Sequence, residues 1–164
     1  PFAQRLAEHF SASSRHGLPL ALALMDLDRF GAINKRFDHT VGDRVIAGVG
    51  SLVQDSLRAE DVGGRLGGDE FGLLLPYTSA VDAARVVRRV RDRMRELETA
   101  VDGSAPLVVT GSIGFESYAA GDLDSVEALR RHAERALRRA KEEGGDRAVY
   151  FRSLGAGPRE AAGA

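Results

Sequence analysis

The sequence of 164 residues is 43% hydrophobic and 29% charged, the balance of a folded soluble domain, which argues against a disordered or fibrous chain. It contains no cysteine, so a disulfide framework and a thiolate metal site are excluded, and the composition suits the cytoplasm. The formal net charge is −1 and lysine occurs only at Lys35 and Lys141, which gives no indication of a surface for nucleic acid.

The chain begins with a helical pattern, followed by a strand and two helices. Phe2, Leu6 and Phe10 fall on one side of a helix that already includes residue 1, so we expect the domain to begin upstream of this fragment. Residues 20–27, LALALMDL, form a continuous apolar run that ends in acidic residues, as in a strand buried on both faces. We expect Thr40 to be the N-cap of the second helix. The apolar positions are Phe30, Ile33 and Phe37 in the first helix, and Val41, Val45, Val49, Leu52 and Val53 in the second.

The longest apolar run, from Leu18 to Met25, is about half as long as a membrane-spanning helix. No charged-then-apolar signal peptide opens the chain. We therefore expect no membrane contact by this domain, and a cytoplasmic location that leaves open an anchor at the inner membrane in the parent protein.

The second half predicts a hairpin and then alternating helices and strands. Two apolar stretches, residues 62–66 and 71–75, flank Gly67-Gly68-Asp69-Glu70, whose glycines permit a tight turn. The pattern then predicts, in order, a helix from Ser79 to about Leu97, a β-rich stretch from Leu107 to Phe115, a helix from Ser125 to near Gly144, and a strand from Ala148 to Phe151.

This order of elements predicts an α+β fold, an α/β sandwich in which helices pack around a mixed sheet. We assign residues 1–152 to one domain. Residues 153–164 are small, glycine-rich and without periodicity, so we expect a flexible tail or linker there.

Two acidic segments lie where predicted strands end: Asp26 to Asp28, and Asp69 with Glu70. A carboxylate at the end of a buried strand is costly unless it is compensated, and a divalent cation would compensate both segments. Oxygen ligands without histidine or cysteine favour Mg²⁺ or Mn²⁺, which usually serve phosphate chemistry on nucleotides. Gly67-Gly68 could bring backbone N–H groups close to such phosphates.

Each feature alone has a simpler explanation, because a Gly-Gly-Asp turn is more often a plain hairpin and an acidic strand end a solvated loop. Their combination is more specific. The DxD segment Met25-Asp26-Leu27-Asp28-Arg29-Phe30 is followed by Ile33-Asn34, His39 and Gly42-Asp43, then by Gly67-Gly68-Asp69-Glu70-Phe71, Ser112-Ile113-Gly114, Ala133-Glu134-Arg135-Ala136-Leu137 and Ala140-Lys141.

With these motifs the sequence resembles the GGDEF domains of bacterial diguanylate cyclases, from about Phe2 to Phe151. The resemblance implies a mixed, mainly antiparallel five-stranded sheet of the nucleotide-cyclase type, in the order βααββαβαβ. It also implies a metal-dependent enzyme that condenses two GTP molecules into cyclic di-GMP. Since each domain would hold one GTP, the active enzyme would be a homodimer.

The resemblance implies roles for individual residues. Asp26 and Asp69, with the Leu27 carbonyl oxygen, would bind Mg²⁺ or Mn²⁺, and Asp69 and Glu70 would be catalytic, with Asp69 as the candidate base. Asn34 and Asp43 would recognise the guanine edge of GTP. The other GTP contacts would be Phe30, His39, Gly67, Gly68 and Lys141, although a structural role is an equally open alternative for His39.

A second motif, Arg58-Ala59-Glu60-Asp61, lies six residues before Gly67 when counted from Asp61. In the family an R-x-x-D at this spacing marks the site of product inhibition. The arginine fork suits the phosphates and guanine face of cyclic di-GMP, Asp61 suits the base N–H donors, and Arg89 could add a contact. The alternative is an exposed salt bridge at a helix end.

Some positions depart from the usual family pattern. Gly31 stands where the family has a lysine that contacts phosphate, and Gly145 where it has an arginine; Asp38 and Arg138 replace a glycine and a tyrosine. Losing two charge-assisted phosphate contacts could slow turnover by ~10² or more, unless Lys141 or Arg29 substitutes in part. One alternative is therefore a degenerate domain that binds GTP or cyclic di-GMP as a regulatory module without turnover. Another is a scaffold or dimerisation domain without nucleotide.

Overall fold

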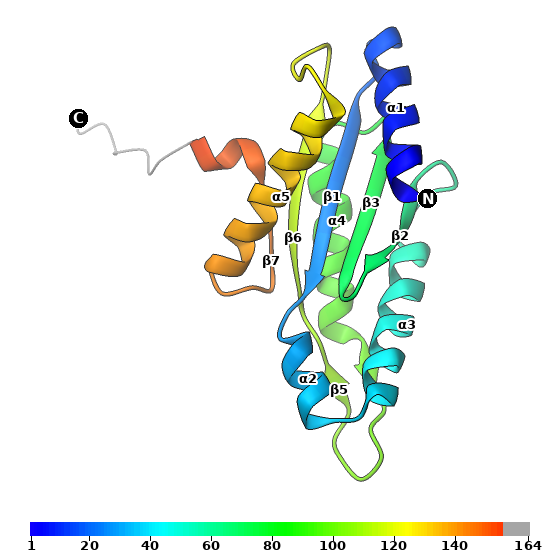
Figure 1. Ribbon diagram of the computed structural model, residues 1–164, viewed down its shortest axis with the longest axis vertical. Coiled ribbons are helices and arrows are strands. Elements are labelled where there is room, and N and C mark those ends of the chain that lie inside the picture. The colour runs from blue at the N-terminus through cyan, green and yellow to red at the C-terminus, as the bar shows by residue number, and fades with distance from the viewer. Residues whose placement is uncertain (156–164) are drawn as a thin grey trace, which may run out of the picture.

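The computed structural model describes residues 1–155, in which one mixed β-sheet carries helices on both faces (Figure 1). The helices are α1 (Phe2–His16), α2 (Phe30–Arg36), α3 (His39–Asp55), α4 (Ala80–Glu96) and α5 (Val126–Glu142), and a 3-10 helix, η1, spans Phe151–Gly155. The strands are β1 (Leu20–Leu27), β2 (Val62–Gly67), β3 (Glu70–Pro76), β4 (Glu98–Thr99), β5 (Leu107–Val108), β6 (Gly111–Tyr118) and β7 (Arg147–Tyr150). Among these helices, none combines the length and the apolar character that crossing a bilayer requires.

The five-stranded sheet has the order β2-β3-β1-β6-β7. β1 lies in the middle and pairs antiparallel with β3 and β6, so that Asp26 stands opposite Glu70 on one side and Ser112 on the other. β2 is antiparallel to β3, and β7 is parallel to β6. Every residue of β1 is buried, as expected for a strand with neighbours on both edges and helices on both faces. The predicted α+β fold with a mixed, mainly antiparallel sheet is confirmed.

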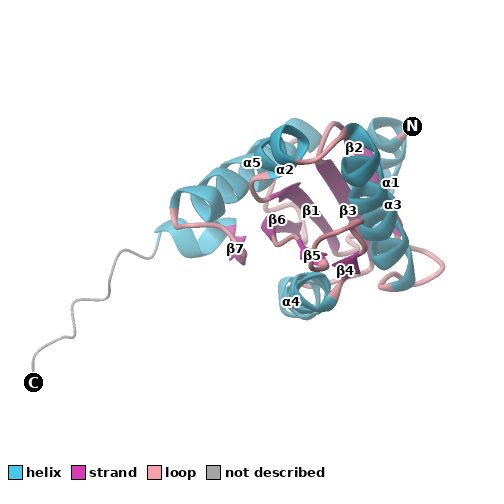
Figure 2. Ribbon diagram, turned by 90° about the horizontal axis from the view of Figure 1, so that it is seen from below, coloured by secondary structure: helices cyan, strands magenta, loops and turns pink. Residues whose placement is uncertain are grey.

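Side chains of β1 alternate between two cores. Ala23, Met25 and Leu27 belong to the core under α3 and α4, whereas Leu22 and Leu24 belong to the core under α1 and α5. Figure 2 shows α4 and α5 on opposite sides of the sheet. This burial fixes the register of β1, because a slip of one residue would exchange the two sets of side chains.

The N-cap of α3 differs from the prediction. Asp38, not Thr40, is the N-cap, and its side chain accepts a hydrogen bond from the Val41 N–H at 3.2 Å. Asp38 has the extended backbone, with ψ at 171°, that an N-cap requires, while Thr40 already lies in the first helical turn. The prediction of Thr40 was therefore wrong.

The C-terminal half contains more elements than predicted. The β-rich stretch is two strands, β5 and β6, and β5 pairs with β4 in a separate two-stranded sheet. β4 has only two residues, too few for a periodic pattern. The 3-10 helix η1 includes Ser153, where we expected the tail to begin. The rest of that tail, residues 156–164, lies outside the described residues, so the domain limits stay a prediction.

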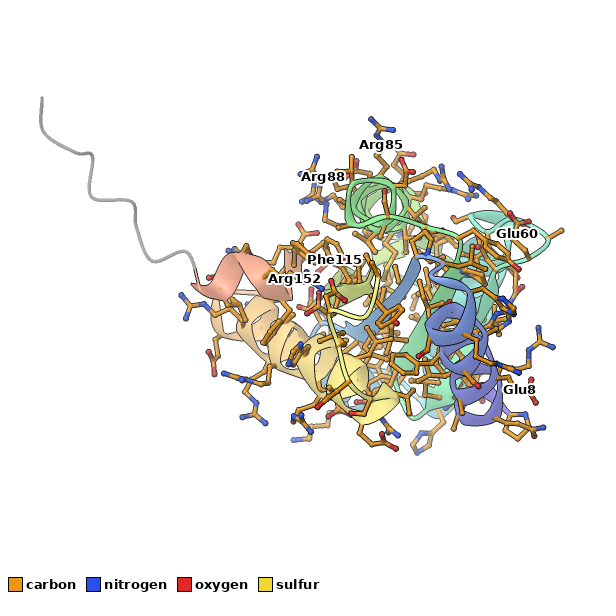
Figure 3. The ribbon with its side chains drawn as sticks, turned by 90° about the horizontal axis from the view of Figure 1, so that it is seen from above. Glu8, Glu60, Arg85, Arg88, Phe115 and Arg152 are labelled. Atoms are coloured by element: carbon orange, nitrogen blue, oxygen red, sulfur yellow. The ribbon has the colours of Figure 1, made fainter. Side chains whose placement is uncertain are left out.

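A buried carboxylate on β6 attaches η1 to the sheet. Glu116 is only 1% exposed, and it accepts hydrogen bonds from the Arg152 Nε at 3.0 Å and from the Ser117 N–H at 2.8 Å. Its second oxygen lies 2.9 Å from Nδ1 of His132 on α5. Arg152 is the second residue of the 3-10 helix, and Figure 3 labels it. These partners explain how a carboxylate is tolerated at this depth.

Close packing between α5 and β6 leads to a prediction about stability. A Cβ at Gly114 would lie 2.0 Å from the Leu137 backbone nitrogen and 2.4 Å from the Ala133 carbonyl oxygen. Backbone atoms cannot turn aside, so we expect Gly114→Ala to lower the free energy of unfolding by about 2 kcal/mol, measured by urea denaturation. Gly64→Ala in β2 is the control, because a Cβ there meets nothing within 4 Å. An equal loss in both variants would contradict this account of the packing.

Candidate active site

The carboxyl end of β1 and the β2–β3 turn lie side by side at one end of the sheet (Figure 1). The Leu27 N–H donates to the Asp69 carbonyl oxygen at 3.2 Å, which joins the two segments through the backbone. The side chains of Asp26 and Asp69 are close enough to interact. The structure therefore brings together the two acidic segments in which the sequence predicts a shared cation.

The β2–β3 turn depends on a left-handed residue. Gly68 has a φ of 54°, a conformation that glycine adopts without the penalty of a Cβ. Arg65 donates from Nε to the Gly68 carbonyl oxygen at 2.8 Å and closes the turn. Gly67 and Gly68 are both exposed, and a Cβ at either would meet nothing within 4 Å. The backbone of the turn is therefore open to a ligand.

Asp26 is a buried carboxylate beside a single ammonium group. It is 8% exposed, and Lys141 in the last turn of α5 donates from Nζ to its Oδ2. Burial raises the pKa of Asp26 above its ordinary value, the hydrogen bond from Lys141 opposes that rise, and the neighbouring Asp69 adds to it. A positive charge placed between Asp26 and Asp69 would relieve both the burial and the repulsion. Lys141, predicted as a GTP contact, lies in the acidic part of the site.

Asp28, the second acid of the DxD segment, is compensated by other means. The hydroxyls of Thr110 and Ser112 donate to its Oδ2 and Oδ1, each at 2.7 Å. The Asp146 N–H donates to Oδ2 at 2.8 Å. Three donors satisfy this carboxylate within the protein, so the expected cation is needed at Asp26 and Asp69 but not at Asp28.

The predicted guanine contacts meet where α2 packs on α3. Gly42 leaves room for the half-buried Asn34, because a Cβ at residue 42 would lie 2.2 Å from the Asn34 Oδ1 and 3.3 Å from the Phe30 Cζ. Asp43 is the next residue of α3 and is exposed, as is His39 at the start of this helix. The structure therefore places an amide, a carboxylate and an aromatic ring at the junction of the two helices, next to the end of β1.

The turn after α5 holds one of the two departures from the family pattern. The Gly144 N–H donates to the Lys141 carbonyl at 3.1 Å and the Gly145 N–H to the Ala140 carbonyl at 3.0 Å, the Schellman arrangement of a helix C-terminus. Gly145 has a φ of 76°, and a Cβ there would lie 2.8 Å from the Asp28 Oδ1. Glycine thus suits both the backbone conformation and the neighbouring carboxylate. It also means that residue 145 has no positively charged side chain.

The R-x-x-D residues also come together. The Arg58 N–H donates to the Asp61 Oδ2 at 2.9 Å, and Arg89 on α4 donates to the Ser56 carbonyl oxygen at 2.7 Å. Burial raises the pKa of Asp61, while the Arg58 N–H and the charges of Arg58 and Arg89 oppose the rise. Arg93 donates to the Ser56 Oγ at 2.7 Å and was not predicted. Its position four residues after Arg89, on the same side of a helix, could have indicated it.

The donor set at the end of β1 fits a small divalent cation. It consists of the Asp26 and Asp69 carboxylates and nearby backbone carbonyls, all of them oxygen ligands. In the part of the chain that the structure describes, no three acidic or histidine side chains gather into a complete metal cage. Mg²⁺ does not require one, since it commonly binds through one or two carboxylates, with water and substrate phosphates in the other positions.

A family model and several known proteins match most of this chain. A model of the family described as diguanylate cyclase, GGDEF domain, matches residues 1–147. Diguanylate cyclase DgcP of Pseudomonas aeruginosa is 34% identical over 88% of the chain, and diguanylate cyclase A of Treponema denticola is 34% identical over 90%. The chain spans 21% of the first protein and 40% of the second, so it corresponds to one part of each.

Solved structures give a matching fold. Diguanylate cyclase SiaD of Pseudomonas aeruginosa, determined in complex with its activator SiaC, has a TM-score of 0.83 and 39% identity, over 90% of this chain and 55% of that chain. The GGDEF domain of YfiN, also called TpbB, from the same species has a TM-score of 0.84 and 30% identity, over 91% of this chain and 92% of that chain. The residues matched by the family model include both acidic segments of the candidate site.

Proposed function

The chain belongs to the GGDEF family of diguanylate cyclase domains, and from this membership we propose that it condenses two GTP molecules into cyclic di-GMP and two pyrophosphates. The main support is the meeting of Asp26 and Asp69 at the end of β1, with Asp26 buried beside Lys141. A second support is the intact turn Gly67-Gly68, which leaves its backbone open beside those carboxylates.

In this proposal Asp26 and Asp69 hold Mg²⁺ or Mn²⁺ together with the Leu27 carbonyl oxygen. The bound cation supplies Lewis-acid activation of the 3′-hydroxyl and neutralises charge on the α-phosphate and the pyrophosphate. Asp69 accepts the 3′-hydroxyl proton as that oxygen bonds to the α-phosphorus of the other GTP and the bond to pyrophosphate breaks. Glu70, exposed at the start of β3, is the second candidate catalytic residue.

The remaining residues bind the substrate. Asn34 and Asp43 offer an amide and a carboxylate to the guanine edge, and adenine would leave these groups unpaired. Phe30 lies on α2 with Asn34, and His39 lies on α3 with Asp43. In this proposal both side chains contact the bound GTP. The phosphates lie against the N–H groups of Gly67-Gly68, and Lys141 neutralises part of their charge.

Two copies of the domain are needed, because each binds one GTP and the product contains two. The residues of the β2–β3 turn from Gly67 to Gly68, and Glu70 beside them, are exposed, so a second copy can approach them. We therefore propose a homodimer as the active form, with the reaction rate rising more steeply than linearly with enzyme concentration.

The direct test incubates the purified chain with GTP and Mg²⁺ or Mn²⁺ and detects cyclic di-GMP by mass spectrometry. We expect product that disappears when the metal is chelated. If GTP binds and no product forms, the alternative of a regulatory domain without turnover is correct. That alternative is favoured by Gly31 and Gly145, two glycines at positions where the usual family pattern has lysine and arginine.

We further propose that Arg58, Asp61 and Arg89 bind cyclic di-GMP as an inhibitor. Asp61 must be ionised to accept the N–H donors of guanine, and its pKa is raised above the ordinary 3.8, with burial as the largest cause. We therefore expect affinity for cyclic di-GMP to be constant near neutral pH and to fall as the pH is lowered through this raised pKa. Calorimetric titration across the acid range measures the effect.

Asp61→Asn is the matched control for this pH dependence. The variant cannot ionise, so we expect weak binding of cyclic di-GMP without the fall at low pH. The same fall in the variant and in the original chain would show that another group is responsible and would remove Asp61 from the binding site.

A further inference from the structure

We propose that Asp28 is a positioning residue that fixes Lys141 against Asp26. It acts through a brace, by which we mean the Asp28 carboxylate, the hydroxyls of Thr110 and Ser112, and the turn of residues 144–146. The proposal rests on the proposed cyclase function, since it concerns how Lys141 is presented to the GTP phosphates. It gives a specific role to an acid of the DxD segment that has no place among the cation ligands.

The brace is built for an ionised carboxylate. Asp28 receives the Thr110 and Ser112 hydroxyls at 2.7 Å each and the Asp146 N–H at 2.8 Å, so three donors converge on two oxygens. A carboxylate accepts at both oxygens and donates at neither, which matches this set. Thr110 directly precedes β6 and Ser112 is its second residue, and the hydroxyls of both reach the Asp28 carboxylate. Ser112 is 0% exposed, so loss of its partner would leave a buried hydroxyl unpaired.

The brace connects directly to the end of α5. Asp146, held by Asp28, is joined to Lys141 through the Schellman turn, in which the Gly144 N–H binds the Lys141 carbonyl oxygen. Arg95 on α4 donates to the Asp146 Oδ1 at 2.9 Å and holds the turn from its other side. Helix ends fray where they lack such anchors. The brace therefore sets the position of the last turn of α5, from which Lys141 reaches Asp26.

Gly145 is part of this arrangement. A side chain at residue 145 would place its Cβ 2.8 Å from the Asp28 Oδ1, so the glycine allows the turn to close tightly on the carboxylate. The same glycine removes a positive charge that the family usually places there, and Gly31 removes another. Lys141 is then the one positive side chain left of the three that the family pattern has at positions 31, 141 and 145. We infer that phosphate binding depends more strongly on the exact placement of Lys141 than it would if all three were present.

A double-mutant cycle tests whether Asp28 acts through Lys141. We would measure kcat/KM for GTP and, separately, the affinity for a non-hydrolysable GTP analogue with Mg²⁺, in Asp28→Ala, Lys141→Ala and the double variant. We expect Asp28→Ala alone to lower both quantities by ~10-fold, the usual scale for groups that orient a functional residue. In the Lys141→Ala background it should have no further effect. Effects that multiply in the double variant would overturn the proposal.

Milder variants guard against a simple failure to fold. Thr110→Val removes one hydroxyl of the brace and should lower analogue affinity, whereas Thr110→Ser keeps the hydroxyl and should restore it. Equal affinity for these two variants would count against the brace. If Asp28 had a purely structural role, Asp28→Ala would lower Tm both in the original chain and in Lys141→Ala. The effects of the two substitutions on kcat/KM and on affinity would then multiply in the double variant.

The same measurements separate this proposal from the proposed function. Product formation together with a multiplicative cycle would overturn the brace and leave the cyclase in place. If the analogue binds but no product forms, the proposed cyclase function would be overturned. The double-mutant cycle measured in analogue affinity would still test whether the brace positions Lys141. Absence of any nucleotide binding would overturn both.

Discussion

Replacing Asp69 with asparagine is expected to slow cyclic di-GMP formation by ~10³-fold or more without unfolding the domain. The substitution removes one of the two carboxylates proposed to hold the cation, and also the candidate base for the 3′-hydroxyl. The hairpin should survive, because the Leu27 N–H binds the Asp69 backbone carbonyl and not its side chain. Initial rates of product formation, with Tm as the measure of folding, test the prediction.

Glu8→Gln provides the control for the loss of one negative charge. Glu8 is exposed on α1, and Figure 3 shows it on the outer surface of that helix. Its replacement should leave the rate unchanged. A rate within tenfold of the original chain in Asp69→Asn, with Tm preserved, would show that the reaction does not use this carboxylate.

The main elements could be predicted from the sequence because their periodicity is local. The apolar run of β1 and the capping serine of α4, Ser79, each specify an element within a few residues, and the structure confirms both. The N-cap of α3 was missed because Asp38 and Thr40 are both residue types that favour this position, and only the backbone conformation distinguishes them. β4 was missed because a two-residue strand has no pattern of its own.

Some features of the candidate site could also be predicted from the sequence, and others could not. The DxD and GGDEF segments were recognisable as motifs, and the expectation that Asp26 and Asp69 meet came from the resemblance of these motifs to the family. The position of Lys141 at Asp26 depends on how α5 packs over β1, a relation between elements far apart in the chain. The partners of Asp28 are equally distant in sequence, since Thr110 precedes β6 and Ser112 lies within it. Ordinary hydroxyl residues at the start of a strand gave no signal of that contact.

The second large effect is expected from Gly42→Ala, which should weaken GTP binding by ~10²-fold while the fold remains stable. The added methyl group would lie 2.2 Å from the Asn34 Oδ1, so the Asn34 side chain must move away from its present position. The nearest atoms belong to the ends of side chains and not to backbone, and alanine favours a helix over glycine by about 1 kcal/mol. Tm should therefore not fall, and calorimetry with a GTP analogue should report the loss of affinity.

Gly50→Ala on the same helix separates a local effect from a general one. A Cβ at residue 50 would approach only the Phe71 ring, at 4.0 Å, so this variant gains the same helical preference without touching Asn34. It should bind GTP as the original chain does. Asn34→Ala should reproduce the loss seen in Gly42→Ala, and combining the two should add little, because the methyl group acts only by displacing that amide. Unchanged GTP affinity in Gly42→Ala would mean that Asn34 does not read the guanine base, and the proposed recognition site would have to lie elsewhere.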